Sequence, residues 1–140
     1  MINNEHYYRA LNVMDRIDEI REEKGIIKTE FGKQLGHTMP YYHVTYNGFR
    51  IIKFSTLVNF AKVLDISVEY LLTGRNKDVF KPVKLDLDLI STTKGKRFPN
   101  YLRVIKHYIK QGRTKDINLK TLFEFEHYLN IPVTKLLRGE

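Results

Sequence analysis

The sequence contains no cysteine and no tryptophan, and only four prolines in 140 residues. Without cysteine the chain cannot form a disulfide scaffold, a cysteine zinc site, an iron–sulfur cluster or a thiol nucleophile. No apolar run approaches the roughly 18–20 residues that a membrane-spanning helix needs. The N-terminal residues lack a basic segment followed by an apolar core, so we expect no secretory signal. These absences predict a cytoplasmic protein with no membrane partner.

Residue groupings that are typical of catalysis are also missing. None of the five histidines stands in a His-Glu-x-x-His arrangement, and no His/Asp/Glu cluster has the spacing of a metal site. The sequence has no glycine-rich phosphate loop. We therefore predict that the protein is not an enzyme and binds neither a cofactor nor a metal, and no small-molecule substrate is evident.

Positive charge is present in excess and is unevenly distributed. The formal net charge is +8. Residues 1–75 carry ten Lys and Arg against nine Asp and Glu, whereas residues 76–140 carry fourteen against seven. The excess therefore lies almost wholly in the second half, and nucleic acid is the first partner to consider.

The chain contains an internal repeat. Residues 54–75 align without gaps onto residues 119–140, and nine aligned positions are identical. Seven of these are large apolar residues at helical spacings, and one is a glycine (Gly74 and Gly139) just after an apolar run. The shared order of two helices, a break and a glycine favours duplication over chance.

The first copy predicts five short helices within residues 1–75. Apolar residues recur at three- and four-residue steps from about 8 to 24, and Gly25 supplies a stop. Residues 29–35 form a second short helix. Thr38 is a plausible N-cap for a third helix ending at Asn47-Gly48, and Ser55 and Ser67 are predicted to cap the fourth and fifth.

Several segments of this first copy resemble the lambda-repressor-like (Cro/CI, or XRE) helix-turn-helix family, over about residues 11–75. The resemblance implies a five-helix domain whose third helix lies in the DNA major groove, and a regulator of transcription that often acts as a dimer. The segments that carry it are Lys24-Gly25-Ile26, residues 30–36, Asn47-Gly48 and residues 57–74, the last being the most specific.

The resemblance places the recognition helix between Gly36 and Gly48, where the residue types are unusual. Only Tyr41 and His43 offer a hydrogen-bond donor to a base edge, and an apolar side chain there could at best touch a thymine methyl. Two interpretations of this helix stay open: it contacts DNA with weak sequence specificity, or the domain has kept the fold but uses this surface to bind protein. The candidate DNA-binding residues of this copy are Thr38, Met39, Tyr41, His43, Arg50 and Lys53, with Lys28 and Lys33 as further phosphate contacts.

The second copy, over about residues 84–140, is degenerate but more basic. Residues 85–90 alternate apolar and acidic side chains, which predicts either a strand or the start of a helix. Residues 98–111 have a helical pattern that Gly112 ends. On this helix four basic or imidazole side chains recur at i, i+3, i+4 and i+7, which places them on one face. The candidate DNA contacts of this copy are Lys96, Arg97, Arg103, Lys106, His107, Lys110 and Arg113.

Together these patterns predict an all-α chain of two tandem small helical bundles, residues 1–75 and 76–140. The predicted function is sequence-specific, repressor-like regulation of transcription, with double-stranded DNA as the partner. A homodimer through one copy is an open alternative to two half-sites covered by one chain. The competing function is a protein-interaction module, antitoxin-like or anti-repressor, that has the same fold and reads DNA weakly or not at all.

Overall fold

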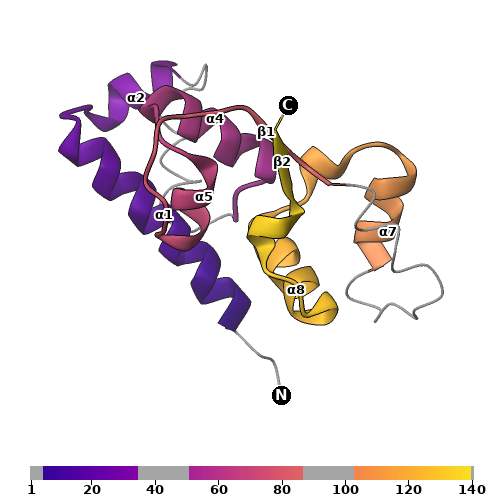
Figure 1. Ribbon diagram of the computed structural model, residues 1–140. Coiled ribbons are helices and arrows are strands. Elements are labelled where there is room, and N and C mark those ends of the chain that lie inside the picture. Colours follow the sequence, from indigo (N-terminus) through magenta and orange to yellow (C-terminus); the bar gives the residue numbers. More distant parts are fainter. Residues whose placement is uncertain (1–4, 35–50, 87–102, 140) are drawn as a thin grey trace.

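The computed structural model describes residues 5–34, 51–86 and 103–139, which are mostly helical (Figure 1). The predicted third helix, residues 38–47, lies outside these ranges. Among the elements described, α2 and α7 lie at opposite ends of the molecule, and the short strands β1 and β2 lie between them (Figure 1).

The first two helices follow the apolar spacing of the sequence. Helix α1 spans Glu5–Glu23 and α2 spans Lys28–Gln34. Val13, Ile17 and Ile20 form the buried stripe of α1. Gly25 has φ +68°, and the Ile26 N–H donates to the Arg21 carbonyl at 3.1 Å, so the left-handed glycine ends α1 as predicted.

Helix α4 (Phe54–Leu64) and helix α5 (Val68–Thr73) carry the motif that resembles the helix-turn-helix family. Ser67 caps α5 as predicted, since its hydroxyl accepts a hydrogen bond from the Tyr70 N–H. The prediction that Ser55 caps the fourth helix is wrong. Lys53 occupies the N-cap of α4 and makes no side-chain cap hydrogen bond.

The segment after α5 is held against the first half of the chain. The Ser67 N–H donates to the Asp78 carbonyl at 2.9 Å, and the Phe80 N–H donates to the Asp65 carboxylate at 3.2 Å. Lys77 lies 3.4 Å from the Glu23 carboxylate. Residues 77–80 are therefore tied to the first half of the chain by hydrogen bonds and an ion pair.

The described elements of the second half are shorter and include the two strands. They are β1 (Val83–Leu85), α7 (Arg103–Lys110), the 3-10 helix η2 (Thr114–Asp116), α8 (Leu119–Leu129), the 3-10 helix η3 (Val133–Leu136) and β2 (Leu137–Gly139). The strands pair antiparallel, with Lys84 opposite Arg138. Of residues 85–90, which the sequence leaves open between a strand and the start of a helix, only Leu85 lies in β1; residues 87–90 lie outside the described ranges, so that choice stays a prediction.

Buried apolar side chains of both halves belong to one cluster. Helix α1 packs against α5 and also against α8. Phe31 and Phe60 from the first half and Leu119, Phe123 and Phe125 from the second are almost completely buried. The described parts of the two halves therefore share one hydrophobic core. The division of the chain into two bundles at residue 75 remains a prediction from the sequence repeat.

None of the helices in the described parts of the chain combines the length and the apolarity that crossing a bilayer requires.

Candidate nucleic-acid interface

Helix α7 carries the positions of the basic face that the sequence predicts. Its backbone is helical from Arg103 to Lys110, so the positions of Arg103, Lys106, His107 and Lys110 share one side. His107 and Lys110 are exposed. The side chains of residues 103–106 lie outside the description, so the row is established for the backbone positions and for the last two side chains.

The chain reverses direction after α7, which brings a further cation beside it. Gly112 has φ +67°, and the Arg113 N–H donates to the Tyr108 carbonyl at 2.8 Å. A left-handed residue at this position favours glycine because it carries no Cβ. The Arg113 guanidinium then lies 5.4 Å from the Tyr108 ring centroid, a cation–π distance.

The charges of three cations act on the carboxylate of Asp116 in η2. Arg113 Nε donates to Asp116 Oδ2 at 2.9 Å. This hydrogen bond lowers the pKa of Asp116, and the charges of Lys53 and Lys115 lower it further. Lys53 from the first half therefore acts on the same carboxylate as Arg113 and Lys115 from the second.

A backbone bridge accounts for this meeting of the two halves. Lys53 and Asn118 form an isolated antiparallel β-bridge. The Phe54 N–H donates to the Ile117 carbonyl at 2.8 Å, and the Leu119 N–H donates to the Ile52 carbonyl at 3.0 Å. The side chains on either side of the bridge are buried, which fixes Lys53 at the junction while its own side chain remains exposed.

The strand pair adds another lysine to the same surface. Lys84 of β1 and Lys115 line one groove of about 380 Å³, together with Ser55 and Asn59 of α4. Lys84 is exposed. Its place next to η2 depends on pairing between β1 and β2, which lie more than fifty residues apart, so no local sequence signal indicates it.

We call these five exposed cations the cationic cluster: Lys53, Lys84, Lys110, Arg113 and Lys115. Asp116 neutralises part of it, and its hydrogen bond to Arg113 leaves Lys53, Lys84, Lys110 and Lys115 as the side chains most free to meet an anion. A surface of several cations drawn from different segments fits a polyanion such as a nucleic-acid backbone.

The structure places only some of the predicted site residues. Lys53, Lys110 and Arg113 belong to the cationic cluster, and His107 lies beside it on α7. Lys28 and Lys33 lie on α2, at the far end of the molecule (Figure 1). The other candidates lie outside the described ranges: Thr38, Met39, Tyr41, His43, Arg50, Lys96 and Arg97.

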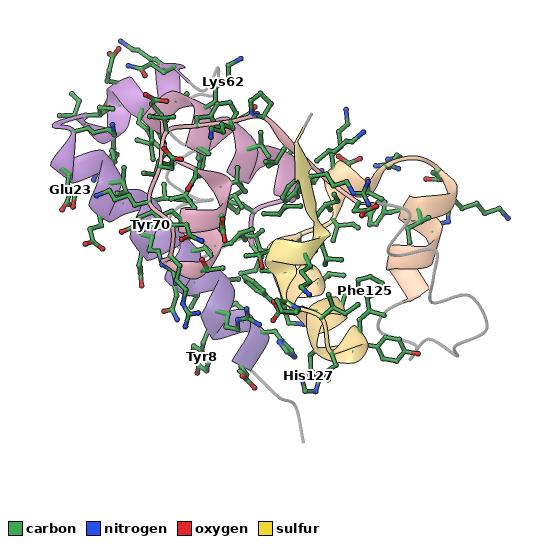
Figure 2. All side chains as sticks on the ribbon, in the orientation of Figure 1. Tyr8, Glu23, Lys62, Tyr70, Phe125 and His127 are labelled. Atoms are coloured by element: carbon green, nitrogen blue, oxygen red, sulfur yellow. The ribbon has the colours of Figure 1, made fainter. Side chains whose placement is uncertain are left out.

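One lysine on the side of α1 and α5 already has partners within the chain. Lys77 is engaged there by Glu23 and lies 5.6 Å from the Tyr70 ring centroid. Figure 2 shows Glu23 and Tyr70 on the side of α1 and α5 that faces away from α7. Lys77 is therefore already engaged by a carboxylate and a ring, unlike Lys110 at the end of α7, which is exposed.

Comparison with known proteins found one regulator among the curated proteins. The chain is 32% identical over 68 residues to the uncharacterized HTH-type transcriptional regulator YqaE of Bacillus subtilis (strain 168). The match covers 48% of this chain and 59% of that protein, so it spans little more than half the relative's length. No family model matches the chain, and no solved structure matches it. The chain is thus similar over about half its length to a helix-turn-helix transcriptional regulator.

Proposed function

We propose that the protein is a DNA-binding transcriptional regulator of the helix-turn-helix class, and that it acts as a repressor-like protein on double-stranded DNA. The cationic cluster is the observation that carries this proposal. It includes Lys53 of the first half, whose backbone bridges Asn118, and Arg113 and Lys115 of the second half. The similarity to an HTH-type transcriptional regulator supports the same class.

The proposal assigns phosphate contacts and base contacts to different parts of the protein. The cationic cluster binds phosphates and fixes the orientation of the protein on the duplex, which by itself carries no sequence information. Sequence reading is assigned to the predicted third helix of the first copy and to α7, each in the major groove. Arg103 is the strongest candidate for a base contact, because an arginine can bind guanine through two hydrogen bonds.

Salt dependence gives the sharpest test of this function. Each phosphate that a cation neutralises adds about 0.9 to the slope of log affinity against log salt. Five contacts would give a slope of about −4.5, which corresponds to a loss of roughly 500-fold between about 50 and 200 mM salt. Fluorescence anisotropy with a labelled mixed-sequence duplex measures this slope directly.

A triple variant, K84Q/K110Q/K115Q, removes three of the five charges from exposed positions. Its slope is expected to be shallower by about 2.7. The matched control is K135Q, which removes one exposed charge from η3, outside the cationic cluster. No salt-dependent binding at micromolar protein would reject the proposal and favour the protein-interaction module. Equal slopes for the triple variant and the control would reject the assigned surface.

A further inference from the structure

Helices α4 and α8 are equivalent in detail, at the register of the sequence repeat. Each has 11 residues. The residue before each helix has nearly the same backbone: φ −81° and ψ 161° at Lys53, φ −79° and ψ 162° at Asn118. Each helix ends on a left-handed residue, with φ 52° at Asp65 and φ 55° at Asn130. The two segments are thus copies in structure as well as in sequence.

The bridge between the halves joins equivalent residues. In the repeat register, 65 residues apart, Lys53 corresponds to Asn118, Ile52 to Ile117 and Phe54 to Leu119. The hydrogen bond from Phe54 to Ile117 therefore becomes the bond from Leu119 to Ile52 when the copies are exchanged. Reciprocal contacts of this kind define a local two-fold axis, as at the interface of a symmetric dimer.

We infer that the protein is a single-chain pseudo-dimer, in which one chain occupies both half-sites of a DNA site whose halves differ in sequence. This inference rests on the proposed function. The bridge holds the two copies in the relation that two subunits of a dimer would have. The single chain therefore needs no second copy to present two DNA-reading units.

Burial at the junction leaves no room for a second chain there. Ile52 and Phe54 are each 3% exposed, Ile117 is 1% exposed and Leu119 is fully buried. The backbone donors and acceptors of the bridge are satisfied within the chain. An edge that is already paired and covered cannot also pair with another molecule.

The two copies differ away from the axis, which predicts different half-sites. After α4 the first copy forms the α-helix α5, whereas after α8 the second forms the 3-10 helix η3 and then strand β2. The second half also carries nearly all the net positive charge. Its half-site is expected to supply more of the phosphate contacts, and the bases read by each copy are expected to differ.

The test uses the full chain and a duplex selected from a random-sequence library. Sedimentation without DNA is expected to show a monomer. Native mass spectrometry of the complex is expected to show one chain per duplex. Hydroxyl-radical footprinting should show two protected patches whose centres lie about 10 bp apart, one turn of DNA.

Two symmetric duplexes, each made by repeating one of the two selected halves, test whether the two copies read different sequences. Each is expected to bind at least about tenfold more weakly than the selected site, because one of its halves presents several wrong base pairs to the copy that lies on it. Two chains per duplex, a palindromic selected site or a single protected patch would overturn the pseudo-dimer while leaving DNA binding intact. Failure to bind any duplex would instead overturn the proposed function.

Discussion

Replacing Glu126 by alanine is expected to weaken the packing of α8 against α1 and against η3 at the same time. Glu126 Oε1 accepts a hydrogen bond from Arg9 of α1, and Glu126 Oε2 accepts one from the Val133 N–H at 2.6 Å. The Arg9 guanidinium also lies 4.1 Å from the centroid of the Phe123 ring in α8. One carboxylate therefore joins three elements of the shared core.

The structure allows the cost of this change to be divided between its partners. Val133 is only 1% exposed, so its N–H would lose its hydrogen bond in a buried place, which costs about 1–3 kcal/mol. The Arg9 side chain is 34% exposed, so its ion pair contributes about 0.2–1 kcal/mol. E126A is thus expected to lose about 2–3 kcal/mol of unfolding free energy.

E126Q is the matched control for this experiment. Glutamine keeps one oxygen that can accept from the Val133 N–H, while its NH2 group takes the place of the oxygen that accepted from Arg9, so the ion pair and the hydrogen bond to Arg9 are lost. Its expected loss is therefore at most about 1 kcal/mol. R9M should lose about 1 kcal/mol, because it removes both the ion pair and the cation–π contact with Phe123.

Urea unfolding followed by circular dichroism measures these differences in unfolding free energy. In a thermal melt, each kcal/mol corresponds to a fall of roughly 2–4 °C in Tm for a chain of this size. A single transition is expected for every variant, because the described halves share one core. Equal destabilisation by E126A and E126Q would refute the role assigned to the Val133 hydrogen bond. Two separate transitions in the wild-type protein would refute the shared core.

Three further predictions concern single groups. N118A should cost about 1 kcal/mol, because the Asn118 side chain accepts from the Thr121 N–H, whereas K53A at the equivalent N-cap removes no cap bond and should change the urea midpoint little. G74A should destabilise by about 1–2 kcal/mol because Gly74 has φ +76° and a Cβ there would lie 3.1 Å from Arg16 Nε, while G139A, whose Cβ would have open space, is the control; equal losses would count against this account. The pKa of Asp116 lies below its usual value, so the stabilisation that its carboxylate provides is present above the unfolded-state pKa and is lost as pH falls through the lower folded-state pKa. An NMR titration of the Asp116 carboxyl should therefore show a higher midpoint in R113A than in wild type, and an unchanged midpoint would show that Arg113 is not the main cause.

Local patterns in the sequence predict the helices well where the signal is local. The apolar spacing of α1, the left-handed Gly25 after it and the Ser67 cap of α5 all appear in the structure. Each depends on residues within a few positions of one another. Interactions of that range are encoded in the segment itself.

Predictions fail or stay ambiguous where a distant segment decides the local structure. Helix α4 begins at Phe54 rather than after Ser55, because the Phe54 N–H is satisfied by Ile117 and Lys53 is held extended in the bridge. Strand β1 has only three residues, and its partner β2 follows more than fifty residues later. The sequence repeat also predicts the same structure after α4 and after α8, because the apolar positions are shared. The structure has the α-helix α5 in the first copy, but the 3-10 helix η3 followed by strand β2 in the second.

The candidate site could be predicted in part for the same reason. The basic positions of α7 follow from helical spacing, and Lys53 was a predicted phosphate contact. Their approach across Asp116, and the addition of Lys84, depend on the bridge and on the strand pair. Such long-range pairings cannot be read from a single sequence by periodicity.

Mapping a bound duplex onto the protein by NMR tests the central claim most directly, namely that the bridge gathers cations of both halves into one DNA-binding surface. On titration with the selected duplex, we expect the largest backbone amide shifts at Lys53, Lys84 and residues 110–116, and little change in η3. Shifts concentrated on the side of Glu23 and Tyr70, with the cationic cluster unaffected, would contradict it.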